Sequence, residues 1–323
     1  MEDKIEEIEL SITGKIPSEK QIKRILEDEM KCIQFLQDKG IIFKSQKCWQ
    51  CGNEMKQKEK MWNCNRRDCR RTQSMLTHSF FENHRLPLNE IFRIYYLWLI
   101  KVPMTSIHIM TGHSTQTIAN NINNIRQLVE SQINDTHEKI GGKDIIVEID
   151  ESLFGRTKYH RGKPVQGQWV IGGVERTPER KIFVKTIDKR NESTLFDIIK
   201  ENVHKGSIIY TDQWKGYHNL SEKLDYQHGT VNHSKYFKDP ETGIHTNTIE
   251  GNWNGIKILT PSRNRAQDKL QPFLSEYVWR RQNINNPWER FLQSLKSYLL
   301  VEAEDKPLME NDESNQTENP NKP

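Results

Sequence analysis

Residues 145–150 have the sequence IIVEID, and this short segment does most to decide which fold the chain is expected to adopt. Its β-branched residues favour a strand, and the alternation of a strand puts Glu148 and Asp150 on the same face. Asp150 comes at the open end of the strand and is therefore the better candidate for a metal ligand. Glu151 should point to the opposite face and is expected to be a neighbour of the site rather than a ligand.

Two further acids fall at comparable positions. A second strand is predicted at SIIYTD (207–212), which ends in Asp212, and the helical segment HTNTIEGNWNGIK (245–257) carries Glu250. Each acid alone is more often structural, because strand ends and first helical turns favour acids. Together they form an oxygen-ligand set that suits two Mg²⁺ ions, which stabilise both oxygens of an in-line phosphoryl displacement. We therefore expect Asp150, Asp212 and Glu250 to be metal ligands and catalytic residues.

Two other residues of the 245–257 segment are candidates for contact with DNA. Lys257 follows Glu250 by two helical turns and so lies on the same face of the helix, where it is placed to hold a phosphate. The alternative is a solvated lysine on an exposed helix. His245 precedes the helix and is a candidate for contact with the scissile phosphate, while Thr246 or Asn247 is expected to cap the helix.

The order of the predicted elements indicates an α/β fold. Strands are expected at 145–150, 168–175, 181–188, 207–212 and 226–231, and helices at 196–203, 247–259, 270–282 and 287–299. This order predicts an RNase H-like core, which is a mixed sheet with helices on both faces.

A cysteine cluster precedes this core. The spacing C-x2-C followed by C-x4-C predicts a closed tetrahedral zinc site of the ribbon type, with Gly52 supplying a turn, and the ligands are Cys48, Cys51, Cys64 and Cys69. Residues 56–71 contain seven Lys or Arg against two acids, and the arginines expected to contact DNA are Arg66, Arg67, Arg70 and Arg71. The alternative is a zinc site that only stabilises a small subdomain.

Between the cysteines and the α/β core, the sequence predicts helices. The first spans 88–101, and a shorter one at 104–110 leads through the turn 111–113 to a third that begins after Ser114 and reaches Ile133. This layout is typical of a helix-turn-helix, although a plain three-helix bundle is the alternative. The side chains then available to DNA are Thr115, Gln116, Asn120 and Asn121. A single amphipathic helix is also predicted at Pro17–Lys39.

The charge distribution is consistent with a polyanionic partner. The formal net charge is +4, but residues 1–9 carry −4 and residues 302–323 carry −5, which leaves +13 on the rest. An acidic N-terminus and the lack of a long apolar run predict no secretory signal, transit peptide or membrane span. Five cysteines in an intracellular-looking chain argue against a disulfide scaffold, and Cys32 is expected to be a small buried residue.

The segments VEIDES, YTDQWKGY and HTNTIEGNWNGIK resemble ISXO-type insertion-sequence transposases and their eukaryotic relatives, the Merlin transposases. Their signature is Asp, Asp, Glu and a Lys seven residues later, and the match covers roughly residues 45–295. The resemblance implies an RNase H-like fold, Mg²⁺ or Mn²⁺, and cut-and-paste DNA transposition. It also implies that Asp150, Asp212 and Glu250 bind the metals and that Lys257 contacts the DNA end. Asn252 departs from the pattern, because many relatives have an aromatic residue there.

The expected function is therefore that of a DDE transposase, which cleaves transposon ends and joins them to target DNA. The alternatives are a domesticated, catalytically silent DNA-binding protein and an RNase H-like nuclease. Expected partners are terminal inverted repeats, target DNA and further copies of the chain in a dimer or higher oligomer. The protein is expected in the nucleus of a eukaryotic host or in the cytoplasm of a bacterial one.

The expected domain boundaries follow from these segments. They are an N-terminal helical segment (1–43), the zinc ribbon (44–80), the helix-turn-helix-like region (86–135), the catalytic domain (143–300) and a disordered acidic tail (301–323).

Overall fold

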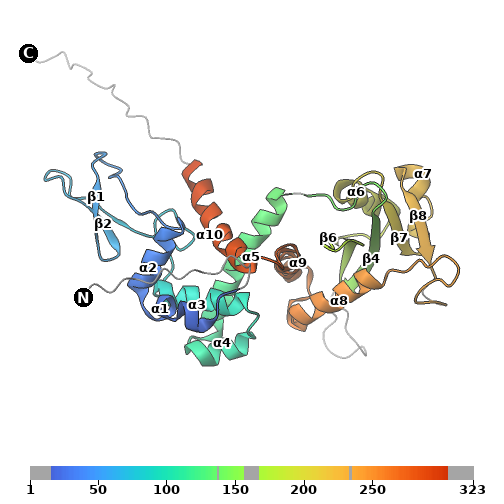
Figure 1. The fold of residues 1–323 in the computed structure, drawn as a ribbon, viewed down its shortest axis with the longest axis horizontal. Helices are drawn as coiled ribbons and strands as arrows, with labels where there is room; N and C mark the ends of the chain where they lie inside the picture. The colour runs from blue at the N-terminus through green and yellow to red at the C-terminus, as the bar shows by residue number, and fades with distance from the viewer. Residues whose placement is uncertain (1–15, 137, 156–166, 233–234, 305–323) are drawn as a thin grey trace, which may run out of the picture.

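The computed structural model describes residues 16–136, 138–155, 167–232 and 235–304, so most of the expected acidic tail lies outside the described residues. A helical body and an α/β body lie side by side, and helix α9 (Gln267–Gln282) runs between them (Figure 1). None of the helices in the described ranges has the length and hydropathy needed to cross a membrane.

The α/β body contains a five-stranded mixed sheet. Its strand order is β6-β5-β4-β7-β8, in which β4, β5 and β6 are antiparallel neighbours while β7 is parallel to both β4 and β8. The strands are β4 (Ile146–Phe154), β5 (Gln168–Glu175), β6 (Ile182–Ile187), β7 (Ile208–Asp212) and β8 (Gln227–Val231). The predicted mixed sheet is confirmed, and the predicted strands agree with the observed ones to within a few residues.

Helices cover both faces of this sheet, as the alternation of β4 requires. Val147 and Ile149 point into a core with the helix α6 (Glu192–Asn202) and the short helix α7 (Leu220–Leu224). Phe154 points to the opposite face, where it packs with α8 (Asn247–Leu259) and α9. The strand β4 therefore lies at the centre of the sheet with a buried core on each side.

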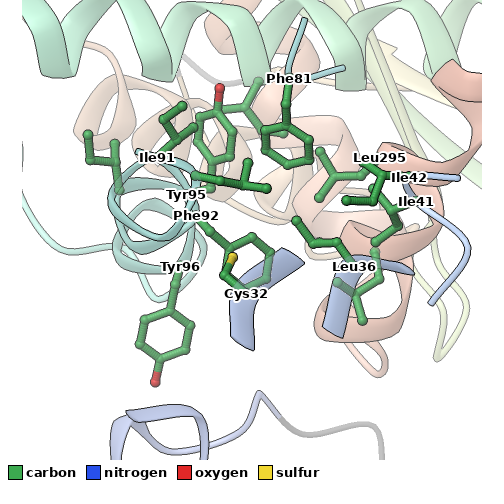
Figure 2. Packing of buried hydrophobic residues seen from close by; sticks show 14 of the residues in the cluster. Cys32, Leu36, Ile41, Ile42, Phe81, Ile91, Phe92, Tyr95, Tyr96 and Leu295 are labelled. Carbon is green, nitrogen blue, oxygen red and sulfur yellow. The ribbon is translucent and has the colours of Figure 1, made fainter. Parts of the chain in front are cut away.

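The helical body has one shared core, part of which appears in Figure 2. A small antiparallel sheet belongs to it, formed by β1 (Met55–Lys58), β2 (Met61–Cys64) and β3 (Thr72–Ser74). The single helix expected at Pro17–Lys39 is wrong, because the chain forms α1 (Glu19–Glu27) and α2 (Glu29–Asp38). Asp28 interrupts them with an extended backbone, at φ −125°, and its carboxylate accepts a hydrogen bond from the Lys31 N–H as the N-cap of α2.

The last helix, α10 (Pro287–Glu304), packs into the core of the helical body. Its Trp288 and Phe291 rings each contact the Phe92 ring, at centroid distances of 6.1 and 6.0 Å. Leu295 lies beside Ile41 and Ile42 (Figure 2). The expected catalytic domain of 143–300 thus includes a helix whose core contacts belong to the N-terminal half of the chain.

The helix-turn-helix-like region consists of three helices. They are α3 (Leu88–Leu99), α4 (Met104–Thr111) and α5 (Thr115–Thr136). Gly112 ends α4 in the left-handed conformation, at φ +72°, and the Ser114 hydroxyl caps α5 by accepting a hydrogen bond from the Thr117 N–H. The expectation that Asn121 is available to DNA is wrong, because Asn121 is buried and donates to the Thr117 carbonyl.

Candidate active site and cysteine cluster

The sheet register aligns the first two candidate ligands. In the parallel pair of β4 and β7, Ile146 lies opposite Ile208 and Glu148 opposite Tyr210. The same offset, continued by two residues, sets Asp150 level with Asp212. Asp212 is the last residue of β7, but the expectation that Asp150 lies at the end of its strand is wrong, because β4 continues to Phe154 in its pairing with β5. Adjacent strands are about 4.8 Å apart, so the two carboxylates project from adjoining positions on the same face of the sheet.

Glu250 approaches the two aspartates from the first turn of α8. Burial raises the pKa of Asp150, the charges of Asp212 and Glu250 raise it further, and a hydrogen bond from Trp253 opposes the rise. The three carboxylates are thus close enough for their charges to act on one another. At least one pair of their oxygens lies beyond 4.8 Å, since only the four cysteines form a tighter cluster among the described residues.

Glu148 fixes the start of α8 on the central strand. Its carboxylate is fully buried and accepts hydrogen bonds from the Thr248 N–H at 2.8 Å, the Ile249 N–H at 3.0 Å and the Thr248 hydroxyl at 2.8 Å. Thr246, the N-cap residue, makes no side-chain cap of its own. A carboxylate from another element therefore satisfies the free N–H groups of this helix end, which also carries a partial positive charge.

Arg176, at the end of β5, completes this anchor. Its Nε donates to Glu148 at 2.6 Å, and its terminal nitrogen donates to the His245 carbonyl at 2.6 Å. The His245 ring lies 3.6 Å from the Glu148 carboxylate, and burial lowers its pKa, with help from the Arg176 charge. His245, predicted to contact DNA, thus lies at the helix start as part of the anchor. No pattern in the sequence pointed to Arg176.

Trp253 connects α8 directly to the first acid. Its indole N–H donates to an Asp150 carboxylate oxygen at 2.9 Å. The ring lies over Gly172 of β5, the residue paired with Asp150, and a Cβ at Gly172 would come within 2.7 Å of the Trp253 ring. Gly172 is therefore required to be small so that the indole can reach Asp150. The sequence offered one signal for this contact, the Gly-Gly pair at 172–173 inside an apolar strand.

Glu151 lies on the opposite face, as expected, and is buried there. The Tyr217 hydroxyl donates to its carboxylate, and Arg190 donates to it at 3.1 Å. Burial raises the pKa of Glu151 to about 7, against the effects of the Tyr217 hydrogen bond and the Arg190 charge. The Arg190 guanidinium also lies 4.0 Å from the ring centroid of Trp214, and the backbone N–H of Trp214 donates to the Asp212 carboxylate. Glu151 thereby holds the segment that follows Asp212.

Lys257 lies on the face that its spacing from Glu250 predicted. It is half-buried, and its ammonium nitrogen is 5.6 Å from the ring centroid of Phe154, at the end of β4. The Lys257 carbonyl accepts a hydrogen bond from Arg265, which also donates to the Thr260 carbonyl at 3.0 Å and so satisfies the end of α8. Both ends of α8 are therefore held by charged side chains from other segments.

The four predicted cysteines converge. Their sulfur atoms all lie within 4.8 Å of one another, and the Cys48–Cys69 and Cys51–Cys64 sulfur distances are each 3.6 Å. A disulfide requires about 2.05 Å, whereas zinc at about 2.3 Å from each sulfur sets sulfurs about 3.8 Å apart. Burial raises the pKa of the Cys48 thiol, but hydrogen bonds from the backbone N–H groups of Gln50 and Cys51 lower it, and the resulting pKa is about 7. This donor set can hold a metal ion.

The backbone around the cysteines matches this role. Gly52 is left-handed, at φ +68°, and its N–H donates to the Cys48 carbonyl, so it forms the predicted turn. The predicted DNA-contact arginines, Arg66, Arg67, Arg70 and Arg71, are all exposed.

Removal of the Glu148 carboxylate should loosen α8. We expect Glu148→Ala to lower the free energy of unfolding by about 3 kcal/mol, because it leaves Arg176 and two N–H groups without their acceptor. Glu222→Ala, at an exposed position of α7, is the control and should change stability by less than about 0.5 kcal/mol. Urea unfolding measures both, and hydrogen exchange should be faster at the Thr248 and Ile249 amides. Unchanged exchange there would refute the role of Glu148 as the cap.

Two glycine substitutions should have opposite effects. Gly172→Ala should destabilise the protein by about 1–3 kcal/mol, because its methyl group would overlap the Trp253 ring. Gly251→Ala in α8 should stabilise it by about 0.5–1 kcal/mol, since nothing lies within 4 Å of the new methyl group. Thermal unfolding of both variants tests the packing, and a neutral or stabilising Gly172→Ala would contradict it.

Comparisons with known proteins agree with the sequence resemblance. The ISXO2-like transposase domain matches residues 139–282, which include all of the candidate active-site acids. An uncharacterized transposase-like protein of Haemophilus influenzae is 30% identical over 104 residues, covering 32% of this chain and 82% of that protein.

Among solved structures, the pre-cleavage Mos1 transpososome aligns with a TM-score of 0.24 and 13% identity, over 67% of this chain and 81% of that one. A simian T-cell lymphotropic virus intasome in complex with the PP2A regulatory subunit B56 gamma aligns with a TM-score of 0.29 and 14% identity. This alignment covers 58% of this chain and 67% of that one. Such low TM-scores carry no weight in the assignment, which rests on the domain match and the Haemophilus relative. On those two findings, the chain belongs to the ISXO2-like transposase family.

Proposed function

We propose that the protein is a DDE transposase with an RNase H-like catalytic core, which cleaves transposon ends and joins them to target DNA. The observation that supports this most is the common placement of three acids. Asp150 lies on the central strand β4, Asp212 ends the neighbouring parallel strand β7, and Glu250 comes from a helix that Glu148 and Trp253 attach to β4. Acids held in this way are preorganised to bind cations, because their positions do not depend on the cations for support.

Each candidate residue has a separate role in the proposed chemistry. Asp150, Asp212 and Glu250 would hold two Mg²⁺ or Mn²⁺ ions, which when bound stabilise the attacking and leaving oxygens of an in-line displacement. Trp253 keeps the Asp150 carboxylate in one orientation. Lys257, on the same helix face as Glu250, would neutralise a phosphate of the DNA end. Cleavage by water and attack by a 3′-hydroxyl are the same class of displacement, so one site serves both.

The remaining parts of the chain are assigned to structure and DNA binding. We assign a structural zinc ion to the cysteine cluster, because a closed set of four thiolates leaves no position for a substrate. Exposed arginines of the ribbon and the exposed start of α5, at Thr115 and Gln116, would contact DNA. Synapsis of two ends calls for a dimer or higher oligomer on DNA.

An active enzyme is favoured over a domesticated DNA-binding protein by the support around the acids. Glu148, Arg176 and Glu151 are charged groups at buried or half-buried positions, and each makes hydrogen bonds that hold a segment carrying a candidate ligand. All three acids and Lys257 are also present, as the proposed chemistry requires.

Substitution of either aspartate tests the proposal. We expect Asp150→Asn and Asp212→Asn to reduce Mg²⁺-dependent cleavage of a labelled transposon end by about a thousandfold or more, because each removes charge from the ligand set. Binding to the end should stay within about twofold, and the control Asp197→Asn, at an exposed position of α6, should cleave normally.

The products also separate the alternatives. Incubation of the labelled end with a plasmid should give a joined product, which a nuclease would not form. Full cleavage by either aspartate variant would reject the assignment of the acids. Absence of cleavage by the unmodified protein on ends it binds would favour the domesticated protein.

A further inference from the structure

The first cysteine turn displays an aromatic ring. Trp49 lies between Cys48 and Cys51, and 65% of its surface is exposed. Both neighbouring cysteines belong to the four-sulfur cluster, so the backbone that carries the ring is held from both sides. The Trp49 side chain is not among the buried core residues, in contrast to Trp62 of β2, which is 4% exposed.

A cation from the second cysteine turn stacks on this ring. The Arg71 guanidinium carbon lies 5.4 Å from the Trp49 ring centroid, within the range of a cation–π contact. The Arg71 carbonyl accepts a hydrogen bond from the Cys64 N–H at 2.8 Å, which fixes the arginine backbone relative to the cluster. One face of the indole is therefore partnered by Arg71, and the rest of the ring remains largely open to solvent.

The surface around this pair is strongly basic. Arg66, Arg67 and Arg70 are exposed, and no ion pair to an acid is recorded for them in the described part of the chain. The loop that carries them contains one acid, Asp68. A surface of this charge is complementary to a polyanion and not to a basic or neutral protein partner.

We propose that Trp49 and Arg71 form a stacking platform for an unpaired DNA base, with the neighbouring phosphates held by Arg66, Arg67 and Arg70. The inference rests on the proposed function insofar as it takes DNA as the substrate. An aromatic ring beside cations is the usual means of binding single-stranded nucleic acid, because every base has a π-face. In a duplex those faces are already stacked on their neighbours, so the platform selects DNA with an unpaired segment, as at an opened or staggered end.

The test compares two DNA forms with the full-length, zinc-loaded protein. Fluorescence anisotropy gives the Kd for a labelled blunt duplex and for the same duplex with a single-stranded tail. Trp49→Ala should weaken binding to the tailed DNA by about tenfold and to the blunt DNA by less than about twofold. Trp49→Phe should retain most of the preference for the tail. Met61, an exposed residue of β2, provides the control, and Met61→Ala should leave both Kd values unchanged.

Arg71→Lys is the second variant, because it keeps the charge and removes the planar guanidinium. Arg71→Lys should also weaken binding to the tailed DNA more than binding to the blunt duplex. Zinc content measured on each variant shows whether the ribbon has stayed folded. Equal losses on both DNA forms, or no loss in Trp49→Ala and Arg71→Lys, would overturn the stacking platform. Failure of the unmodified protein to bind any DNA would instead contradict the proposed function.

Discussion

The active-site geometry depends on one buried carboxylate. Glu148 accepts hydrogen bonds from the first turn of α8 and from Arg176, and it is fully excluded from solvent. A charged group in such a place is tolerable only because four donors surround it. Since Glu148 belongs to β4, the start of α8 can adopt one position relative to that strand. Glu250 and Trp253 follow on the same helix, so their placement near Asp150 is a consequence of this contact.

The segment VEIDE divides three tasks among its acids. Glu148 positions the helix that carries Glu250, and Asp150 projects into the candidate metal site. Glu151, on the other face, holds Tyr217 and Arg190 and through them the segment after Asp212. Strand alternation explains how adjacent residues can serve opposite sides of a sheet. A single strand at the centre of the sheet thus organises the two other elements that supply ligands.

The sequence predicted much of this because the relevant signals are local. The apolar strands, the cysteine spacing and the helix N-cap at Ser114 each depend on a few neighbouring residues. Contacts between segments far apart in the sequence could not be predicted from such local signals. Three contacts of this kind join residues far apart in sequence. They are the hydrogen bond from Arg176 to His245, the packing of Trp253 over Gly172 and the packing of α10 on α3. Local patterns also misled where a single residue changed the outcome, as when Asp28 divided one expected helix into two.

Asp150, Asp212 and Glu250 are proposed to hold two divalent cations together. Anomalous diffraction from crystals of the protein bound to an end DNA in the presence of Mn²⁺ would test it most directly. We expect two manganese peaks about 3.5–4 Å apart, with oxygens of all three acids as ligands. Manganese coordinated elsewhere, with these three carboxylates left without a metal, would contradict it.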